Sequence, residues 1–386
     1  MNDSSVVRRR ASLGPNLHLV GKRHARSRLW TPALVLDLDA FEYNAALMAE
    51  YCRESGVALR PHAKTHKCTR IAEHQLRKGA IGISVATVRE ALIMAGVSKS
   101  ILITSPVVGE AKLDAIASLV ERVDELIIVL DSVEAARRLE RRLKRSRRRI
   151  GALIDIDPGM KRTGVSDVRD ALELARFVRG SSVINLVGVQ CYSGMVQHIA
   201  EAPRRANVYR RELRRLETVL EHLERTGFRS KIVSGGGTGT FDLDRRSGIF
   251  TECQAGSYIF MDAQYNAVEL FAAKPRSFKT ALYVQSMVLS NNHQGAATID
   301  AGFKSFAMDG PIPVPSRGAP PSAAFQYYGD EFGRITFQSK RKVDLGTKVE
   351  FVTPHCDPTV NLHDFYHCVR GERLVDIWPI DARGTL

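Results

Sequence analysis

The 386-residue sequence predicts an α/β protein in which a (β/α)8 TIM-like barrel is joined to a C-terminal all-β domain. Eight apolar runs alternate with amphipathic helical segments from residue 57 onward, the pattern of a parallel sheet covered by helices. After about residue 275 the runs become short and alternating, with turns between them and no long helix. The chain also exceeds the length at which a single core stops growing, so about two domains are expected.

The predicted barrel strands follow one another along the chain. They are VALRPH (57–62), AIGISVA (80–86), SILITSPV (100–107), ELIIVLD (125–131), IGALIDID (150–157), VINLVGVQCY (183–192), KIVS (231–234) and SYIFMDA (257–263). The longest helical segment covers 200–226. Eight β-α units favour a barrel over an open sheet, and the chemistry of a barrel gathers where its strands end.

The later runs predict a β domain: KTALYVQSMVLS, GAATIDAG, GRITFQ, TKVEFVTP and RLVDIWP. An earlier run, PALVLDLD (32–39), would be a ninth barrel strand, so we assign it to this domain as well. The predicted barrel therefore covers 40–275. Residues 1–39 and 276–386 form the predicted β-rich domain.

Composition narrows the functional classes. Net charge is +14, with the excess in the Arg-rich N-terminal arm and in the stretch 137–149, where Leu139 and Leu143 have helical spacing. No aromatic residues interleave with these arginines, so we read the stretch as a solvated helix face and expect no nucleic-acid partner.

No apolar run approaches the ~18–20 residues of a membrane span. Six scattered cysteines without a CxxC pair, and no signal-peptide core, favour a cytoplasmic protein, with a transit peptide as the alternative.

The first strand ends in RPHAKTHK (60–67), which places Lys64 between His62 and His66. Lysine forms Schiff bases with carbonyl cofactors, and burial near other cations lowers its pKa towards a useful range. Taken alone the signal is weak, because an isolated lysine is usually solvated.

Two glycine-rich turns predict a phosphate site. SGGGTGT (234–240) follows KIVS directly, and QAGSY (254–258) follows at the next strand. Glycines let backbone N–H groups approach an anion, and barrels often bind phosphate after strands 7 and 8. Tight turns without a ligand are the alternative for either motif alone.

Other polar residues fall at the same rim. Arg162 in IDIDPGMKRTG can bond an oxygen anion, while Tyr192 and His198 follow the next strand. Each alone could be an ordinary rim residue.

In the β domain, PHCDPTVN (354–361) places His355 and Asp357 at i and i+2. On an extended strand both side chains would point to one face and suit a divalent metal of the Mn, Mg or Zn type. A surface histidine and aspartate without metal is the alternative.

Together these motifs resemble the D-threonine aldolase and D-serine dehydratase family, within the alanine-racemase-like, fold-type III class of pyridoxal-phosphate enzymes. The resemblance rests on TPALVLDLDA, RPHAKTHK, DIDPGMKRTG, GVQCYSGMVQH, SGGGTGTF, ECQAGSYIFMDAQY and HCDPTVNL, which span nearly the whole chain. It implies a barrel that binds pyridoxal 5'-phosphate (PLP), a β domain with a metal pair, and a homodimer whose partner helps close the active site.

Residue by residue, the resemblance puts Lys64 in the place of the family's Schiff-base lysine. It implies Arg162 at the cofactor's phenolate oxygen, Tyr192 at its pyridine nitrogen, and His355 and Asp357 as metal ligands. The residues that fall in the family's phosphate loops are Gly237, Thr238, Gly256, Ser257 and Tyr258.

The metal pair favours one branch of this family. The dehydratase branch typically has cysteine two residues after the histidine, whereas this chain has Asp357, which favours the aldolase branch. One departure is Phe332 in DEFG (330–333), where the family often has histidine.

The function implied is cleavage of a D-β-hydroxy amino acid, of the D-threonine type, to glycine and an aldehyde, with Lys64, His355 and Asp357 in catalytic roles. Four alternatives stay open. They are a 3-hydroxy-D-aspartate aldolase, a D-serine or 3-hydroxy-D-aspartate dehydratase, a racemase, and a non-enzymatic PLP carrier.

Overall fold

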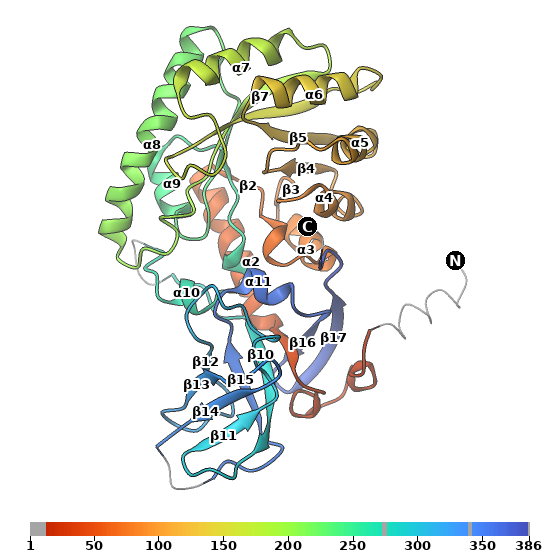
Figure 1. Ribbon diagram of the computed structural model, residues 1–386, viewed down its shortest axis with the longest axis vertical. Helices are drawn as coiled ribbons and strands as arrows, with labels where there is room; N and C mark the ends of the chain where they lie inside the picture. Colours follow the sequence, from red (N-terminus) through yellow and green to blue (C-terminus); the bar gives the residue numbers. More distant parts are fainter. Residues whose placement is uncertain (1–12, 272–275, 339–341, 385–386) are drawn as a thin grey trace, which may run out of the picture.

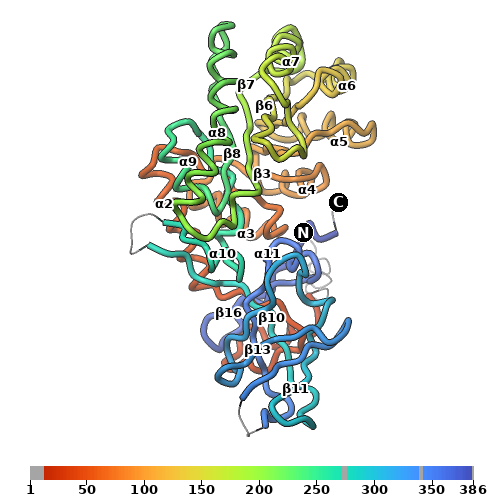
Figure 2. The backbone as a smooth tube through the Cα atoms, turned by 60° about the vertical axis from the view of Figure 1, so that its left-hand side comes forward, coloured from red at the N-terminus to blue at the C-terminus, as the bar shows by residue number. Residues whose placement is uncertain are grey.

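The structure is a computed structural model that describes residues 13–271, 276–338 and 342–384. The first part of the basic N-terminal arm (Arg8, Arg9 and Arg10) lies outside these ranges. Two sheets dominate the described chain, one of eight parallel strands and one of nine mostly antiparallel strands. Figure 1 shows them one above the other, with the short helix α11 (Cys356–Val360) between them, and the turned view in Figure 2 shows the same arrangement.

The parallel sheet has the strand order β2-β9-β8-β7-β6-β5-β4-β3. Its strands are β2 (Ala58–Leu59), β3 (Ile83–Val85), β4 (Ser100–Ile103), β5 (Glu125–Leu130), β6 (Ile150–Ile156), β7 (Ile184–Cys191), β8 (Ile232–Gly235) and β9 (Glu252–Cys253). The helices that alternate with them are α2 (Leu38–Ser55), α3 (Thr69–Arg77), α4 (Val88–Met94), α5 (Glu110–Leu119), α6 (Val133–Leu143), α7 (Val168–Gly180), α8 (Ala202–Arg225) and α9 (Phe241–Ser247). The predicted β-α alternation is confirmed.

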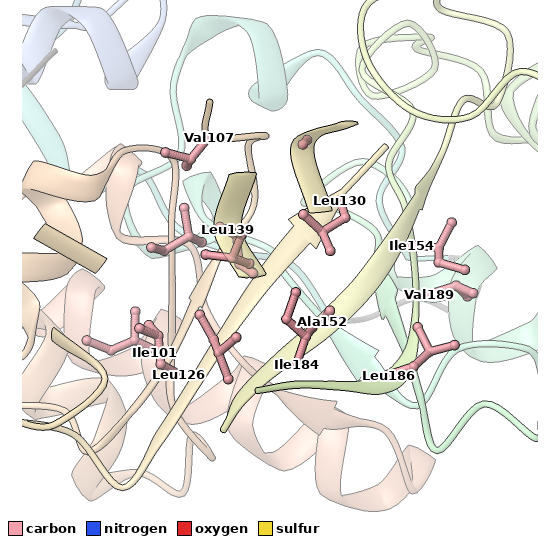
Figure 3. Close-up of a cluster of buried hydrophobic side chains, with 14 of the residues drawn as sticks. Ile101, Val107, Leu126, Leu130, Leu139, Ala152, Ile154, Ile184, Leu186 and Val189 are labelled. Atoms are coloured by element: carbon pink, nitrogen blue, oxygen red, sulfur yellow. The ribbon is translucent and has the colours of Figure 1, made fainter. Parts of the chain in front are cut away.

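The central strands are apolar on both faces, as expected for a parallel sheet with both sides covered. Leu102, Ile127 and Val129 form one small buried cluster with Leu153. The residues that alternate with them belong instead to the large core beneath the helices, part of which Figure 3 shows. On α6 the same core takes up Leu139 and leaves the arginines of that helix outside.

Two expectations about the barrel need correction. The eighth strand is β9, not SYIFMDA (257–263), which forms the 3-10 helix η4 (Ser257–Ile259) and leads into α10 (Ala263–Asn266). In the described chain no strand ladder joins β2 to β3, so the sheet is not a fully closed barrel. A lone parallel bridge between His62 and Ser84 spans that gap, because β2 turns into η3 (Ala63–Thr65) after only two residues.

The second sheet has the order β13-β14-β11-β10-β1-β16-β17, with β15 pairing β10 and β12. Its strands are β1 (Ala33–Asp37), β10 (Leu282–Ser290), β11 (Ala296–Ile299), β12 (Val314–Pro315), β13 (Ala324–Tyr327), β14 (Gly333–Thr336), β15 (Lys348–Val352), β16 (Phe365–Arg370) and β17 (Arg373–Pro379). β1, from the run PALVLDLD, lies between β10 and β16 in this sheet. Two 3-10 turns, η1 (Leu17–Leu19) and η2 (Arg26–Arg28), precede it.

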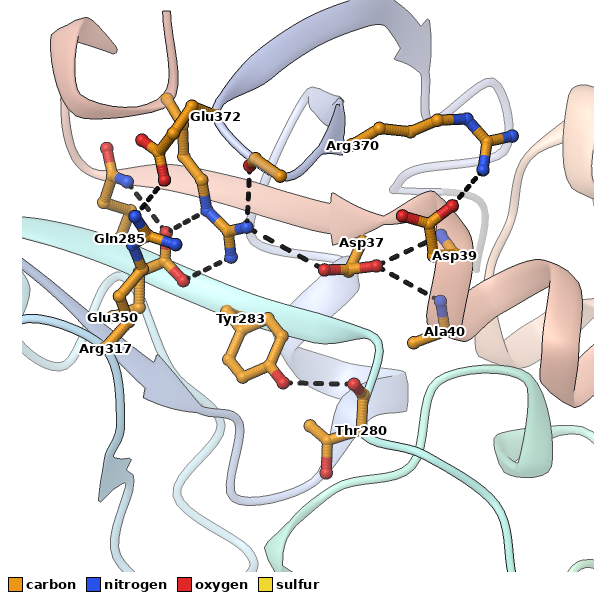
Figure 4. Close-up of polar contacts among 12 residues, drawn as sticks. Asp37, Asp39, Ala40, Thr280, Tyr283, Gln285, Arg317, Glu350, Arg370 and Glu372 are labelled. Atoms are coloured by element: carbon orange, nitrogen blue, oxygen red, sulfur yellow. Dashed lines mark hydrogen bonds and ion pairs between the residues drawn. The ribbon is translucent and has the colours of Figure 1, made fainter. Parts of the chain in front are cut away.

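A buried ion pair ties the N-terminal segment to this sheet (Figure 4). Arg26 Nε and Nη2 donate to the two carboxylate oxygens of Glu350 at 2.7 and 2.6 Å. Arg26 Nη1 also donates to the carbonyl of Gly371, and Gln285 donates to Glu350 at 2.9 Å. The side chains of Arg26 and Glu350 are only 6% and 2% exposed, so each charge depends on the other.

Within the described ranges, none of the helices combines the length and apolar character that a bilayer crossing demands.

Replacing Arg26 with Ala is expected to lower the free energy of unfolding of the β domain by about 3–5 kcal/mol, because Glu350 would stay buried without its partner. Arg317→Ala is the matched control, since its pair with Glu372 is largely exposed and should contribute less than about 1 kcal/mol. Urea unfolding followed by tryptophan fluorescence measures this, because both tryptophans, Trp30 and Trp378, lie in or beside this sheet. Equal small losses in the two variants would contradict the account.

Candidate active site

A cavity of about 400 Å³ opens where the carboxyl ends of the barrel strands face the β domain. Its walls are the segments that follow β2, β3, β4, β6, β7, β8 and β9, joined by two residues at the start of α11. Nine of the ten predicted site residues line it: Lys64, Arg162, Tyr192, Gly237, Thr238, Gly256, Ser257, His355 and Asp357. The structure therefore brings together residues that lie almost 300 positions apart in the sequence.

Lys64 is the lysine that reaches the cavity. Its side chain is 40% exposed, and its Nζ lies 3.9 Å from Asp357 Oδ2 and 5.8 Å from the centre of the Tyr192 ring. Burial lowers the pKa of Lys64, but the attraction of Tyr192 and Asp357 outweighs it, so the pKa is raised above its ordinary value. The expectation of a lowered pKa is thus wrong for this arrangement, because Tyr192 and Asp357 together outweigh both burial and the nearby cation Arg162.

The other cations of RPHAKTHK are fully engaged elsewhere. Arg60 forms two hydrogen bonds of 3.0 Å with Glu252, and Lys67 Nζ lies 2.6 Å from Glu90 Oε1. Both side chains are buried. These pairs fix the backbone on either side of Lys64.

The flanking histidines are neutral supports. His62 Nδ1 accepts from the Lys64 backbone N–H at 3.4 Å, and its Nε2 lies 3.0 Å from Thr104 Oγ1. Burial, reinforced by the charge on Lys64, holds the pKa of His62 well below its usual value. His66 Nδ1 accepts from the Cys68 N–H, and burial lowers the pKa of His66 to about 4. His62 lines the cavity, whereas His66 lies outside its walls.

Arg162 and Tyr192 meet at the rim between β6 and β7. Asp157 accepts from the N–H of Gly159 at 2.9 Å and of Lys161 at 3.1 Å, which folds the DPGMKRTG loop tightly after β6. The guanidinium carbon of Arg162 then lies 5.6 Å from the centre of the Tyr192 ring. Cations approach this ring from two segments, since Lys64 is at a similar distance.

The glycine-rich turns leave backbone donors free. Gly236 has φ +72°, and a Cβ there would lie 2.1 Å from Asp244 Oδ2, so this position requires glycine. The N–H groups of Thr238, Gly256 and Ser257 donate to no acceptor among the described residues, and all three residues line the cavity. Such an array of unused N–H groups suits an anion.

Tyr258 is the one predicted site residue that does not line the cavity. Its ring is fully buried beside Phe278, and its hydroxyl accepts from Gln75 at 3.1 Å. Its backbone N–H donates to Thr238 Oγ1 at 2.9 Å, so it serves the turn and not the cavity. The side chain of Tyr258 therefore supports the loop from behind.

His355 and Asp357 both line the cavity, but not in the predicted way. The segment is not an extended strand: His355 is the N-cap of α11 and Asp357 lies in its first turn. Asp262 holds this helix in place, accepting from the Cys356 N–H at 2.9 Å, while Cys356 itself is buried. Within the described chain no group of three or more His, Cys, Asp or Glu residues is arranged to hold a metal ion.

His198 stands beside this pair. Its ring centre lies 6.4 Å from that of His355 and 4.6 Å from that of Tyr265. Burial lowers the pKa of His198, and the neighbouring His355 lowers it further.

Sequence reasoning missed the amides of the cavity floor. Gln190 donates to Asp155 at 2.9 Å and accepts from Gln254 at 3.0 Å, so β6, β7 and the segment after β9 are joined beneath the cavity. Both glutamines could have been found from the sequence, because Gln190 lies in VGVQCY and Gln254 begins QAGSY, two motifs already assigned to the site.

Comparison with known proteins agrees with this geometry. Residues 36–264 match the alanine racemase N-terminal domain family, and residues 281–369 match the serine dehydratase domain family. A D-threonine aldolase from Arthrobacter sp. is 38% identical over 362 residues, covering 93% of this chain and 94% of the relative.

This chain belongs to the D-threonine aldolase group of the alanine racemase-like family.

A solved D-threonine aldolase from Filomicrobium marinum superposes with a TM-score of 0.88 at 35% identity, covering 93% of this chain and 97% of that one. A 3-hydroxy-D-aspartate aldolase from Paracoccus denitrificans (strain Pd 1222) is 31% identical, with 93% of each chain covered. The predicted resemblance to a family of PLP-dependent lyases is confirmed.

Proposed function

We propose that this chain is a PLP- and divalent-metal-dependent aldolase that cleaves D-β-hydroxy amino acids of the D-threonine type to glycine and an aldehyde. The observation that supports it most is one cavity lined by Lys64, by two glycine-rich turns and by the His355/Asp357 pair. Lys64 supplies an amine, the turns supply anion donors, and the pair supplies nitrogen and oxygen ligands for a hard cation.

The residues present fit PLP. The free N–H groups of Thr238, Gly256 and Ser257 would hold its phosphate, and Lys64 would hold its carbonyl carbon. Arg162 and Tyr192 stand at the rim where the cofactor ring would extend from Lys64. When bound, PLP supplies an electron sink for the pair of electrons that Cα–Cβ cleavage leaves on Cα.

The chain's own residues orient the substrate. Lys64 carries the proton that its Asp357 and Tyr192 surroundings favour, and it must release this proton to act as an amine. At the β-domain side, His198 and His355 converge on the space beyond Lys64, where the β-hydroxyl of a bound substrate would lie. His198 lines the same cavity and has a lowered pKa, so a neutral His198 would be the base that accepts the proton of that hydroxyl.

A divalent cation would be held by His355 and Asp357, with Mn²⁺ as the proposed ion and Mg²⁺ or Zn²⁺ as alternatives. It would polarise the substrate's β-hydroxyl and lower its pKa. Water would complete its coordination, since the described residues offer only two ligands.

Asp357 supports the aldolase over the dehydratase alternative. An oxygen ligand suits a hard cation that activates an alkoxide, whereas the dehydratase branch resembled in sequence has the softer cysteine there. Cys356, the first residue of α11, does not replace it, because its side chain is fully buried and does not line the cavity.

We further propose that the active unit is a homodimer. Large apolar side chains lie exposed on the β-domain side: Trp30 and Leu362 line one hollow with Glu331, next to exposed Phe332. Phe332 does not line the chain's own cavity. Sedimentation should give about twice the 42.8 kDa chain mass, and a stable monomer would refute the dimer.

Lys64→Ala is expected to abolish both the visible absorption of bound PLP and turnover, because no other lysine lines the described cavity. Lys112→Ala, on the exposed face of α5, is the matched control and should retain both. Absorption spectra of the purified proteins and aldehyde release from D-threonine measure the two properties. Normal turnover by the Lys64 variant would refute its assignment.

Product analysis with and without Mn²⁺ tests the reaction itself. D-Threonine should give glycine and acetaldehyde, EDTA should silence the enzyme, and Mn²⁺ should restore it. D-Serine and D-3-hydroxyaspartate are tested in parallel. A keto acid and ammonia would instead identify a dehydratase, and full activity after exhaustive chelation would remove the metal from the proposal.

A further inference from the structure

A carboxylate outside the cavity wall bonds to the proposed metal ligand His355. Asp309 Oδ2 lies 2.8 Å from His355 Nδ1, although the two residues are 46 positions apart. Asp309 comes from the loop between β11 and β12, whereas His355 precedes α11. Asp309 itself does not line the cavity, so its contact is with the far edge of the His355 ring.

The backbone around His355 is already fixed. Its carbonyl accepts from Thr359 Oγ1 at 2.7 Å, and the next N–H donates to Asp262. These bonds do not fix the rotation of the imidazole ring about its side-chain bonds. The hydrogen bond between His355 Nδ1 and Asp309 Oδ2 fixes that rotation.

The loop that carries Asp309 is tied to the same helix. Thr359 Oγ1 accepts from the Ala307 N–H at 3.0 Å, and the carbonyl of Ala307 accepts from Tyr327 Oη at 2.9 Å. Asp309 and His355 are therefore held by one connected set of bonds. The Asp309 side chain is itself 58% exposed, but its loop is anchored two residues earlier, at Ala307.

A carboxylate accepts and cannot donate, so the Nδ1 atom of His355 must carry the hydrogen. In the neutral ring Nε2 then keeps its lone pair, and Nε2 has no hydrogen-bond partner among the described residues. His355 and Asp357 both line the cavity, so this lone pair belongs to the same site as the Asp357 carboxylate. A metal-bound histidine commonly donates its other N–H to a carboxylate in this way.

We propose that Asp309 is a positioning residue, which holds His355 in the tautomer and ring orientation that present Nε2 to a divalent cation. This inference rests on the proposed metal site at His355 and Asp357. It adds a residue that acts through His355 and touches neither the substrate nor the cofactor.

The test is the dissociation constant of Mn²⁺ from the PLP-loaded protein, measured by titration calorimetry or by the electron paramagnetic resonance of free Mn²⁺. Asp309→Ala should weaken binding by about 10- to 100-fold, the usual effect of losing such a partner. Asp309→Asn should recover most of the affinity, because its amide oxygen can still accept the Nδ1 hydrogen. Asp344→Ala removes an exposed carboxylate of the same domain and should leave the affinity unchanged.

The outcomes separate this inference from the metal site on which it rests. If His355→Ala loses Mn²⁺ while Asp309→Ala keeps wild-type affinity, the metal site stands and the role of Asp309 is overturned. Equal losses in Asp309→Ala and Asp309→Asn also overturn it, since they point to a direct ligand or to charge alone. If the wild-type protein binds no Mn²⁺, the metal site and this inference fall together. Circular dichroism melting confirms that each variant is folded.

Discussion

Two buried ion pairs, Arg60 with Glu252 and Lys67 with Glu90, hold the segment on which the rest of the site depends. Arg60 reaches back from the end of β2 towards the start of β4, where it also donates to Ser100. Lys67 is fixed to the first turn of α4, where Glu90 also completes the capping box. A buried charge is costly unless it is paired, so neither cation can swing into the cavity. Of three neighbouring basic residues, Lys64 alone is left as an amine in that space.

The second requirement is that a part of the β domain reaches this lysine. Asp262 makes this link between the two domains. One of its carboxylate oxygens caps α10, which follows the last barrel strand, and the other accepts from the first N–H of α11. Burial raises the pKa of Asp262, and its hydrogen bonds to Tyr265 and Cys356 oppose that rise. Helix α11 brings His355 and Asp357 to the cavity and packs against η3, the turn that carries Lys64. The domain junction therefore sets the distance between the amine and the proposed metal ligands.

Sequence reasoning recovered the parts of this arrangement that have a local signature. Long apolar strands such as β6 and β7, and glycine turns directly after strands, are visible in sequence because period and composition determine them. Short elements are not: β9 has two residues and α11 has five, too few for any periodicity. The sequence predicted that His355 and Asp357 share one face of a strand, whereas the start of a helix brings both residues to one cavity. Tyr258 does not line the cavity, because its backbone N–H donates to Thr238 and its ring packs in the core. The contact of Asp309 with His355 has no local signal, because only tertiary packing creates it.

The central claim is that Lys64, and not its neighbour Lys67, carries the cofactor. Borohydride reduction of the PLP-loaded protein fixes the pyridoxyl group to the lysine that holds it, and peptide mass spectrometry then locates that lysine. The account predicts the label on Lys64, with Lys67 unmodified because Glu90 keeps it buried and paired. A label on Lys67, on another lysine, or on none would contradict it.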